Sequence, residues 1–269
     1  MLSRIVLSVL VATSTLVGAA AQAAPPPMNK SNDYVQIPAG VLDSVLSGGA
    51  SANAPIAVTA FSIRVMPVTV GEFLQFTKTH PKWSRDDVPA VFADHSYLRT
   101  YVGRPMTPQL AAQPVTSVSW FAAAAYCESE GARLPTWYEW EYVAAADATR
   151  SDARKDASWR AQILGWYARP ASVELPAVGT GLNYYGARDM HGLIWEWVDD
   201  FNALLVSADS RNQGDPDQLQ YCGAGAISLQ DRENFAILMR VALLSSLKGA
   251  DATNSLGFRC AKPLIEEKQ

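Results

Sequence analysis

The alternation of apolar and polar residues in the first part of the chain predicts strands. The segment YVQIPAGVL, which begins at Tyr34, fits a strand broken by a Pro-Ala-Gly step. After a loop rich in Gly, Ala and Ser, apolar and polar residues alternate from Ile56 to Val65, and a period of two is typical of a half-buried strand. We therefore expect the N-terminal part of the chain to contribute to a sheet.

Three later segments begin with residues that cap helices. Thr69 and Glu72 have the spacing of a capping box, in which the threonine oxygen and the glutamate carboxylate each accept a free N–H of the first turn. This helix should end at His80, because the residue before a proline is pushed out of the helical region. A second helix is expected over residues 119–130, and a third begins at the Thr136–Glu139 box.

The rest of the chain has weaker periodicity. Residues 82–113 and 149–188 are expected to be mostly irregular, with short strand candidates in the second stretch. The segment DRENFAILMRVALLSSL (231–247) has helical propensity, whereas GFRC (257–260) fits a closing strand. Because no linker interrupts the pattern, we expect one compact domain over residues 34–265.

The first residues have the pattern of a secretory signal peptide. Arg4 supplies the positive charge, an apolar run follows from Ile5 to Ala20, and the small residues Ala-Gln-Ala come next. The alternative, a membrane anchor, needs an apolar span of about 20 residues. We expect residues 1–23 to be removed, residues 24–33 to form a disordered leader, and the protein to be periplasmic.

Composition narrows the classes of function. The formal net charge is −4 at pH 7 and no basic run is present, which argues against nucleic acid as a partner. No later segment is apolar and long enough to cross a bilayer, so we expect no membrane contact after signal cleavage. Outside the cytosol cysteines oxidise, and three of them allow one disulfide and one spare thiol.

Three strings of residues resemble the formylglycine-generating enzyme, or sulfatase-modifying factor, family. They are PVTSVSWFAAAAYCESEGARLPTWYEWEYVAAA (114–146), NYYGARDMHGLIWEWVDDF (183–201) and NSLGFRC (254–260). The resemblance implies a single α+β domain, similar to C-type lectins, with little regular secondary structure. It also implies that much of the segment 231–247 is strand or irregular, despite its helical propensity.

The same resemblance assigns roles to the cysteines. It pairs Cys127 with Cys260, which leaves Cys222 as the spare thiol. Catalytic members of the family hold Cu(I) with two cysteines, a ligand type that suits this soft ion. Counted without gaps, those positions are Asp231 and Ala236. We therefore do not expect copper or formylglycine generation, and whether the chain is an enzyme stays open.

Three residues are candidates for chemistry or substrate contact. Cys222 lies before a Gly-rich turn, where a thiol can be a nucleophile if its pKa is lowered, or a buried structural group. Arg240 and Ser246, with the neighbouring Ser245, fall opposite the family's substrate-facing segment. Ser255 stands where the family has an active-site asparagine.

The segment DMHGLIWEW corresponds to a calcium loop of the family. Calcium prefers oxygen ligands, which Glu196 can give from its carboxylate and His191, Leu193 and Ile194 from their backbone carbonyls. His191 has a second interpretation, since its imidazole can ligate a metal or stabilise the turn. Trp83, Trp159 and Trp166 lie in variable segments and can line a groove.

The resemblance is strongest to exported family members that lack the cysteine pair. Some accompany copper-containing nitrite reductases, and one matures the pyoverdine siderophore. This implies a periplasmic maturation factor that acts oxidatively on a peptide-like substrate, such as a siderophore precursor. The alternative is a non-catalytic, lectin-like accessory protein for a periplasmic copper redox enzyme such as nitrite reductase. A deep pocket that contains both Arg240 and the Cys222 turn would favour the first, and a shallow, featureless groove would favour the second.

Overall fold

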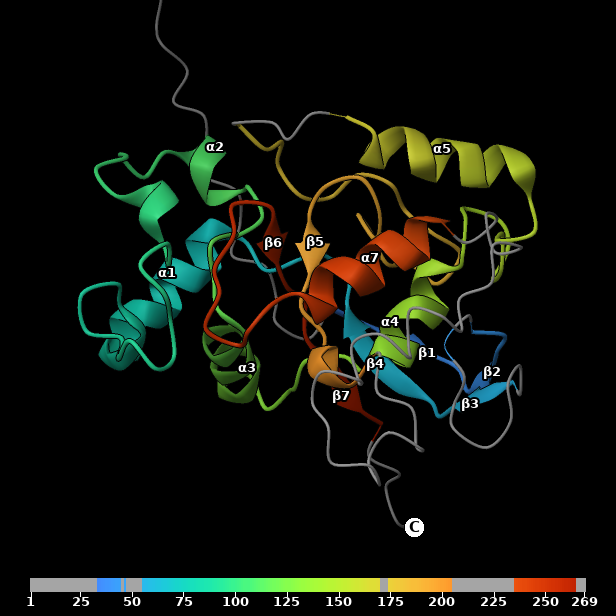
Figure 1. Ribbon diagram of the computed structural model, residues 1–269, viewed down its shortest axis with the longest axis horizontal. Helices are drawn as coiled ribbons and strands as arrows, with labels where there is room; N and C mark the ends of the chain where they lie inside the picture. The colour runs from blue at the N-terminus through green and yellow to red at the C-terminus, as the bar shows by residue number, and fades with distance from the viewer. Residues whose placement is uncertain (1–32, 45, 47–54, 170–173, 205–234, 265–269) are drawn as a thin grey trace, which may run out of the picture.

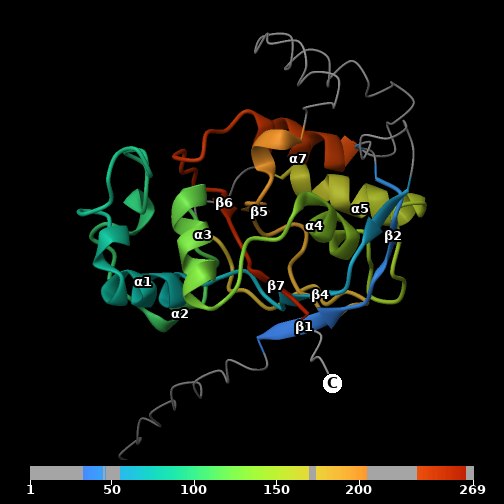
Figure 2. The ribbon, with the colours of Figure 1, turned by 90° about the horizontal axis from the view of Figure 1, so that it is seen from below.

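The computed structural model describes residues 33–44, 46, 55–169, 174–204 and 235–264. Short helices and three small sheets make up this part of the chain (Figure 1). The helices α1, α2 and α3 lie at one end, and α4, α5 and α7 stack at the other, in both views (Figures 1 and 2). This confirms a mixed α+β fold with modest regular secondary structure.

The main sheet combines two strands from the N-terminal part of the chain with one from the C-terminal part. Strand β4 (Phe61–Arg64) lies between β1 (Tyr34–Ile37) and β7 (Ala261–Pro263), and both pairings are antiparallel. Ile37 faces Phe61 across the first pair, and both are buried. The sheet therefore depends on contacts between residues far apart in the sequence.

Two smaller sheets complete the strands. β2 (Gly40–Leu42) and β3 (Ile56–Val58) pair antiparallel, so the stretch 56–65 forms two strands in different sheets and not one. β5 (Trp195–Glu196) and β6 (Leu256–Gly257) pair in parallel. This second pairing places the WEW string directly beside the GFRC string.

The capping residues predict three helices correctly. α1 (Val70–Thr79) and α4 (Trp137–Ala144) both begin with complete capping boxes, and α3 (Trp120–Ser129) begins at Ser119, whose Oγ accepts from the Ala122 N–H. Shorter elements are α2 (Pro108–Ala111) and the 3₁₀ turns Pro81–Trp83, Arg99–Tyr101 and Phe201–Ala203.

Two helices correct the sequence-based expectations. α5 (Ala157–Tyr167) lies inside the stretch expected to be irregular, and it begins where the Asp156 carboxylate accepts two backbone N–H groups. α7 (Phe235–Ser245) lies in the segment for which the family resemblance implied strand or irregular chain. Here the intrinsic helical propensity gave the right answer, and both helices border the candidate site.

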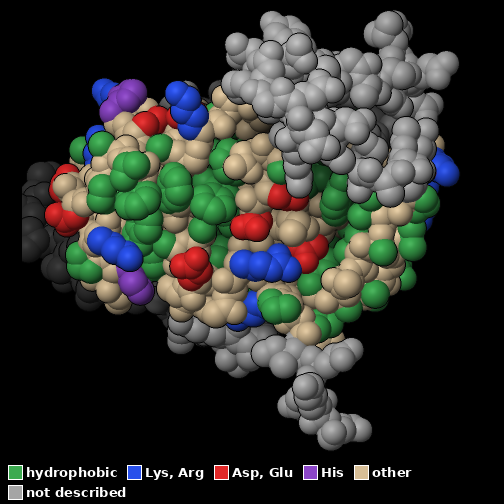
Figure 3. Space-filling view, turned by 60° about the horizontal axis from the view of Figure 1, so that its bottom comes forward, with side chains coloured by type: hydrophobic (Ala, Val, Ile, Leu, Met, Phe, Trp, Pro, Cys, Tyr) green, Lys and Arg blue, Asp and Glu red, His purple; other side chains and the backbone are tan. Residues whose placement is uncertain are grey.

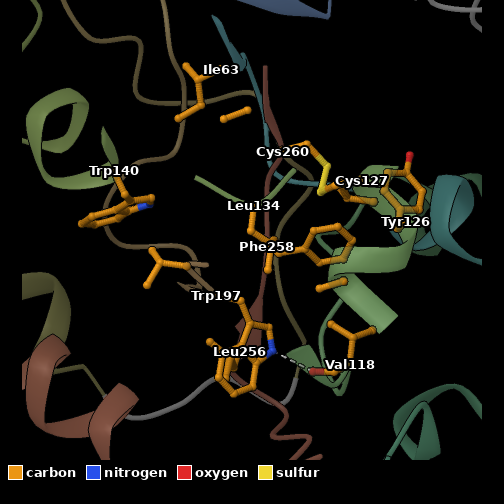
Figure 4. Close-up of a cluster of buried hydrophobic side chains, with 14 of the residues drawn as sticks. Ile63, Val118, Tyr126, Cys127, Leu134, Trp140, Trp197, Leu256, Phe258 and Cys260 are labelled. Carbon is orange, nitrogen blue, oxygen red and sulfur yellow. Dashed lines mark hydrogen bonds between the residues drawn. A yellow bond between two sulfur atoms is a disulfide. The ribbon is translucent and has the colours of Figure 1, made fainter. Parts of the chain in front are cut away.

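A disulfide connects α3 to the C-terminal strand region. Cys127 and Cys260 are both fully buried and bonded to each other, as the resemblance implied. Figure 4 shows this bond beside Tyr126 and Phe258, within the main hydrophobic core. Figure 4 also shows Trp197 nearby, whose indole N–H donates to the Val118 carbonyl at 2.9 Å.

The surface at the end formed by α1, α2 and α3 is partly apolar. On the face in Figure 3, hydrophobic side chains gather at this end, while acidic and basic side chains are mixed near the middle. Val91, Val102 and Met106 are at least half exposed. Within the described ranges, no helix has the length and apolarity that a bilayer crossing needs.

Several sequence-based predictions lie outside the described residues. These are the signal peptide over 1–23, the leader over 24–33 apart from Asp33, and the side chains of Cys222 and Asp231. They stay predictions.

Candidate functional site

A cavity lies between α4, α5 and α7. Its volume is about 40 Å³, which is enough for a few atoms or for ordered water. Most of the wall is aromatic or aliphatic, and three guanidinium groups and one carboxylate also border it. Its lining residues include Trp137, Trp140, Glu141, Tyr167, His191 and Arg240.

Arg240 is the most unusual side chain of this cavity. It lies on α7 and is only 2% exposed, with its guanidinium carbon 3.5 Å from the centre of the Trp140 ring. One nitrogen, Nη2, donates to the Glu196 carbonyl at 2.6 Å, whereas Nε has no hydrogen-bond partner. Burial lowers the pKa of Arg240 to about 10, so the side chain is still charged at neutral pH.

The Glu196 carboxylate is committed to an ion pair. Arg259 donates to it twice, at 2.8 and 2.7 Å, and both side chains are fully buried. The Trp140 indole N–H donates to the same carboxylate at 2.8 Å. The Glu196 carboxylate thus neutralises Arg259 in the interior, and its expected role as a calcium ligand stays a prediction.

The calcium site itself stays a prediction. Among the described residues, no group of three or more His, Cys, Asp or Glu side chains could hold a metal ion. The expected ligands from His191, Leu193 and Ile194 were backbone carbonyls, and these do not depend on the Glu196 carboxylate.

His191 connects two elements of the cavity wall. Its Nε2 lies 2.8 Å from the Ala144 carbonyl at the end of α4, and its Nδ1 lies 3.1 Å from the Tyr167 hydroxyl on α5. A carbonyl can only accept, so Nε2 carries the proton and Nδ1 accepts from Tyr167. Burial lowers the pKa of His191 to about 4, so the ring is neutral at pH 7. This supports the turn-stabilising interpretation.

Aromatic rings hold α5 against this histidine. Tyr167 stacks on Trp195 with ring centres 4.6 Å apart, and burial raises the pKa of its hydroxyl to about 12. Trp159 and Trp166 also pack on His191. A Cβ added to Gly192 would lie 2.9 Å from the Trp166 ring, so this glycine allows α5 to approach closely.

Glu141 borders the cavity from α4. It is 2% exposed and accepts hydrogen bonds from Ser44 Oγ at 2.6 Å and from the Trp137 indole at 2.8 Å. Arg154 lies 3.4 Å from its other oxygen. Burial raises the pKa of this carboxyl, and the three donors oppose that shift.

Of the candidate residues predicted from the sequence, only some line the cavity. Arg240 lines the cavity, as does Trp159, whereas Trp83 and Trp166 do not. Ser246 is exposed beyond the end of α7 and donates to the Leu243 carbonyl, and it does not line the cavity. The neighbouring Ser245 has a buried hydroxyl without a hydrogen-bond partner. Cys222 is outside the described residues.

The segment at Ser255 contributes to a different, more open cleft. Asn254 and Thr253 line it together with Arg99, Thr100 and Ser117. The Ser255 carbonyl accepts from the Trp195 N–H at 2.8 Å in the β5–β6 pair. Ser255 is therefore tied to the framework through its backbone.

Comparison with known proteins decides the family. The family described as "Sulfatase-modifying factor enzyme 1-like domain" matches residues 19–264, which is most of the chain. The chain belongs to this family. The three strings that resembled it from the sequence lie within the matched residues, so that expectation is confirmed.

Individual relatives match only in part. Hercynine oxygenase of Mycobacterium tuberculosis is 32% identical over 163 residues, which cover 52% of this chain and 38% of that protein. The formylglycine-generating enzyme of Streptomyces coelicolor is 31% identical over 169 residues, covering 55% and 52%. The chain thus spans about half the length of these relatives or less. The solved structure of PvdO from Pseudomonas aeruginosa is 19% identical, with a TM-score of 0.46, and covers 86% of this chain and 94% of that one.

This member of the sulfatase-modifying factor family does not fit the copper site of the catalytic branch. Ala236, where the resemblance places one of the two copper-binding cysteines, lies in the wall of the cavity. Its methyl group has no electron pair to donate, and Cu(I) sites in proteins need soft sulfur ligands. The residues that line this cavity therefore do not offer the sulfur ligands that Cu(I) needs.

The most informative cavity residues were missed in the sequence. Tyr167 belongs to α5, whose apolar positions Trp159, Ile163 and Trp166 recur at helical spacing and could have indicated the helix. Glu141 lies in the third helix expected from the sequence. Its role depends on Ser44 and Arg154, which are distant in sequence, so no local pattern predicts it.

Proposed function

We propose that the protein is an exported maturation factor that acts oxidatively on a peptide-like substrate at the cavity between α4, α5 and α7. It does not generate formylglycine. A siderophore precursor is one substrate of the expected class. The reaction would follow a course different from the two-cysteine copper chemistry of the catalytic branch.

One observation supports the assignment of the site to this cavity. Arg240, which the resemblance placed opposite the family's substrate-facing segment, lies in the wall of the same cavity as Ala236. The two residues are four apart on α7, so they lie on the same face of the helix and border a single space. A buried cation beside aromatic rings gives that space both polar and apolar means of recognition.

The oxidative character has separate support. The relatives include a hercynine oxygenase and a formylglycine-generating enzyme, so the family includes oxygenase-type proteins. The signal pattern of the first 23 residues favours export, and the Cys127–Cys260 disulfide fits an oxidising compartment.

The test is a comparison of small molecules from strains with and without the gene. Untargeted mass spectrometry should find an accumulated precursor in the deletion strain that differs from the mature compound by two hydrogens or one oxygen. The wild-type gene should remove this precursor, whereas Arg240→Lys should not. Arg104→Lys, an exposed position away from the cavity, is the matched control and should act like wild type.

Two outcomes contradict the proposal. If Arg240→Lys protein is present in the periplasm at normal level and removes the precursor fully, the cavity is not the site. If no compound changes but a periplasmic copper enzyme loses activity in the deletion strain, the accessory-protein alternative replaces the oxidative one.

A further inference from the structure

Arg240 carries a buried charge that the described residues do not neutralise directly. The nearest structural partner is a backbone carbonyl, that of Glu196, and the carboxylate of Glu196 is held by Arg259 and Trp140. No carboxylate of the described residues forms an ion pair with Arg240. Buried charges in proteins are normally paired, because removing an ion from water costs several kcal/mol.

The hydrogen bonds of Arg240 are also incomplete. Its Nε is buried and has no partner, although an unused N–H in the interior costs free energy. The ring of Trp140 covers one face of the guanidinium, whereas the Nε edge is left without a partner. A guanidinium edge is a planar fork that matches the two oxygens of a carboxylate.

The other groups around the cavity do not offset this charge. Glu141 is the one carboxylate among the described lining residues, and its negative charge faces Arg154 and two neutral donors. His191 contributes a neutral ring between Tyr167 and Ala144. The cavity therefore has an excess of positive charge and a size of about 40 Å³, which accommodates a carboxylate group.

We propose that this cavity binds a carboxylate-bearing ligand, with the carboxylate on the edge of Arg240 and an attached flat ring against the aromatic wall. The proposal names the substrate class of the proposed function and rests on that function only for the identity of the site. A whole ring needs more room than the cavity now offers. Binding of the ring therefore requires α5 to move away from His191, against which Tyr167 and Trp159 now pack.

The test measures binding without turnover. The purified protein is titrated with 4-fluorobenzoate and with its neutral analogue 4-fluorobenzamide, and fluorine NMR of the ligand gives the dissociation constants. The carboxylate should bind at least tenfold more tightly than the amide, which is about 1.4 kcal/mol. Arg240→Lys should lose at least tenfold for the carboxylate, because an ammonium lacks the planar fork, and Arg104→Lys should stay within twofold of wild type.

A second variant protects the test against a folding defect of Arg240→Lys. Ala236→Phe keeps the arginine and fills the cavity, so it should abolish binding of 4-fluorobenzoate. Equal affinity for the two ligands, or unchanged carboxylate binding in Ala236→Phe, overturns the proposal. Carboxylate binding at the cavity with no precursor change in the deletion strain would reject the proposed function alone, and a precursor change without carboxylate preference would reject this inference alone.

Discussion

The buried Glu196–Arg259 pair gives the sharpest prediction about stability. Replacing Glu196 with glutamine removes the negative charge but keeps the size of the side chain. Arg259 then stays fully buried, with backbone carbonyls of Arg64, Val65 and Arg188 as its remaining partners. The glutamine can accept through one oxygen only, whereas the carboxylate accepts from Arg259 twice and from Trp140 once.

The expected loss follows from this geometry. Breaking one partner of a buried ion pair costs about 3–5 kcal/mol, because the other charge is left without compensation. For a domain of this size, 1 kcal/mol lowers the melting temperature by roughly 2–4 °C. We therefore expect Glu196→Gln to melt about 6–20 °C below wild type. Glu196→Gln combined with Arg259→Met should recover part of that loss, since no charge then remains buried.

Urea unfolding, followed by tryptophan fluorescence, measures the free energy of unfolding of each variant. Arg150→Gln is the control, because its ion pair with Asp147 is on the surface and 48% of the Arg150 side chain is exposed, so its midpoint should match wild type. A free energy of unfolding for Glu196→Gln within 1 kcal/mol of the wild-type value would refute the assigned role of the ion pair. A loss of stability that occurs only when calcium is present would indicate that the Glu196 carboxylate binds the metal.

Three other predictions use the same unfolding assay. Removing the disulfide with Cys127→Ala and Cys260→Ala, whose sequence separation is 133, should cost about 5 kcal/mol in the chain-entropy model; a cost below 1 kcal/mol would contradict it. The pKa of His191 is lowered from 6.5 to about 4, so its contribution to the free energy of unfolding should be complete above pH 6.5. Between pH 6.5 and pH 4 the free energy of unfolding should fall by at most about 1.4 kcal/mol per pH unit. His191→Gln should flatten this slope, and an unchanged slope would exclude His191 as its source. Gly192→Ala combines a φ of +83° with a contact on Trp166, so it should lose about 1–2 kcal/mol and expose tryptophan, and a neutral result would show that α5 does not rest on this glycine.

The capped helices were predictable because their signals are local. The boxes at Thr69 and Thr136 need only residues three apart, and the structure shows both complete. The strand break at residues 59–60 was not predictable in this way. Alternation continues through Ile56–Val65, and only the choice of partner, β2 for one half and β1 for the other, divides it.

Only those residues of the candidate site that the family resemblance covers were predictable from the sequence. Arg240 was found by its position opposite a substrate-facing segment, and Ala236 by counting back to the lost cysteine. Tyr167 and the rest of α5 lie in a segment without family strings, and that helix contributes the rings that close the cavity. Its helical spacing was visible, but Gly165 and the mixture of aromatic and charged residues made the pattern weak.

The residues that identify the family in this chain serve its framework. The glutamate of WEW and the arginine of GFRC are Glu196 and Arg259, which neutralise each other in the interior. The cysteine of GFRC is bonded to α3, and its glycine, Gly257, has no room for a Cβ beside the Val115 carbonyl. These constraints hold whatever reaction the domain performs, so similarity in these strings transfers the fold and leaves the chemistry open. We therefore expect what this protein binds to depend on the cavity that Ala236 and α5 border, and not on these strings.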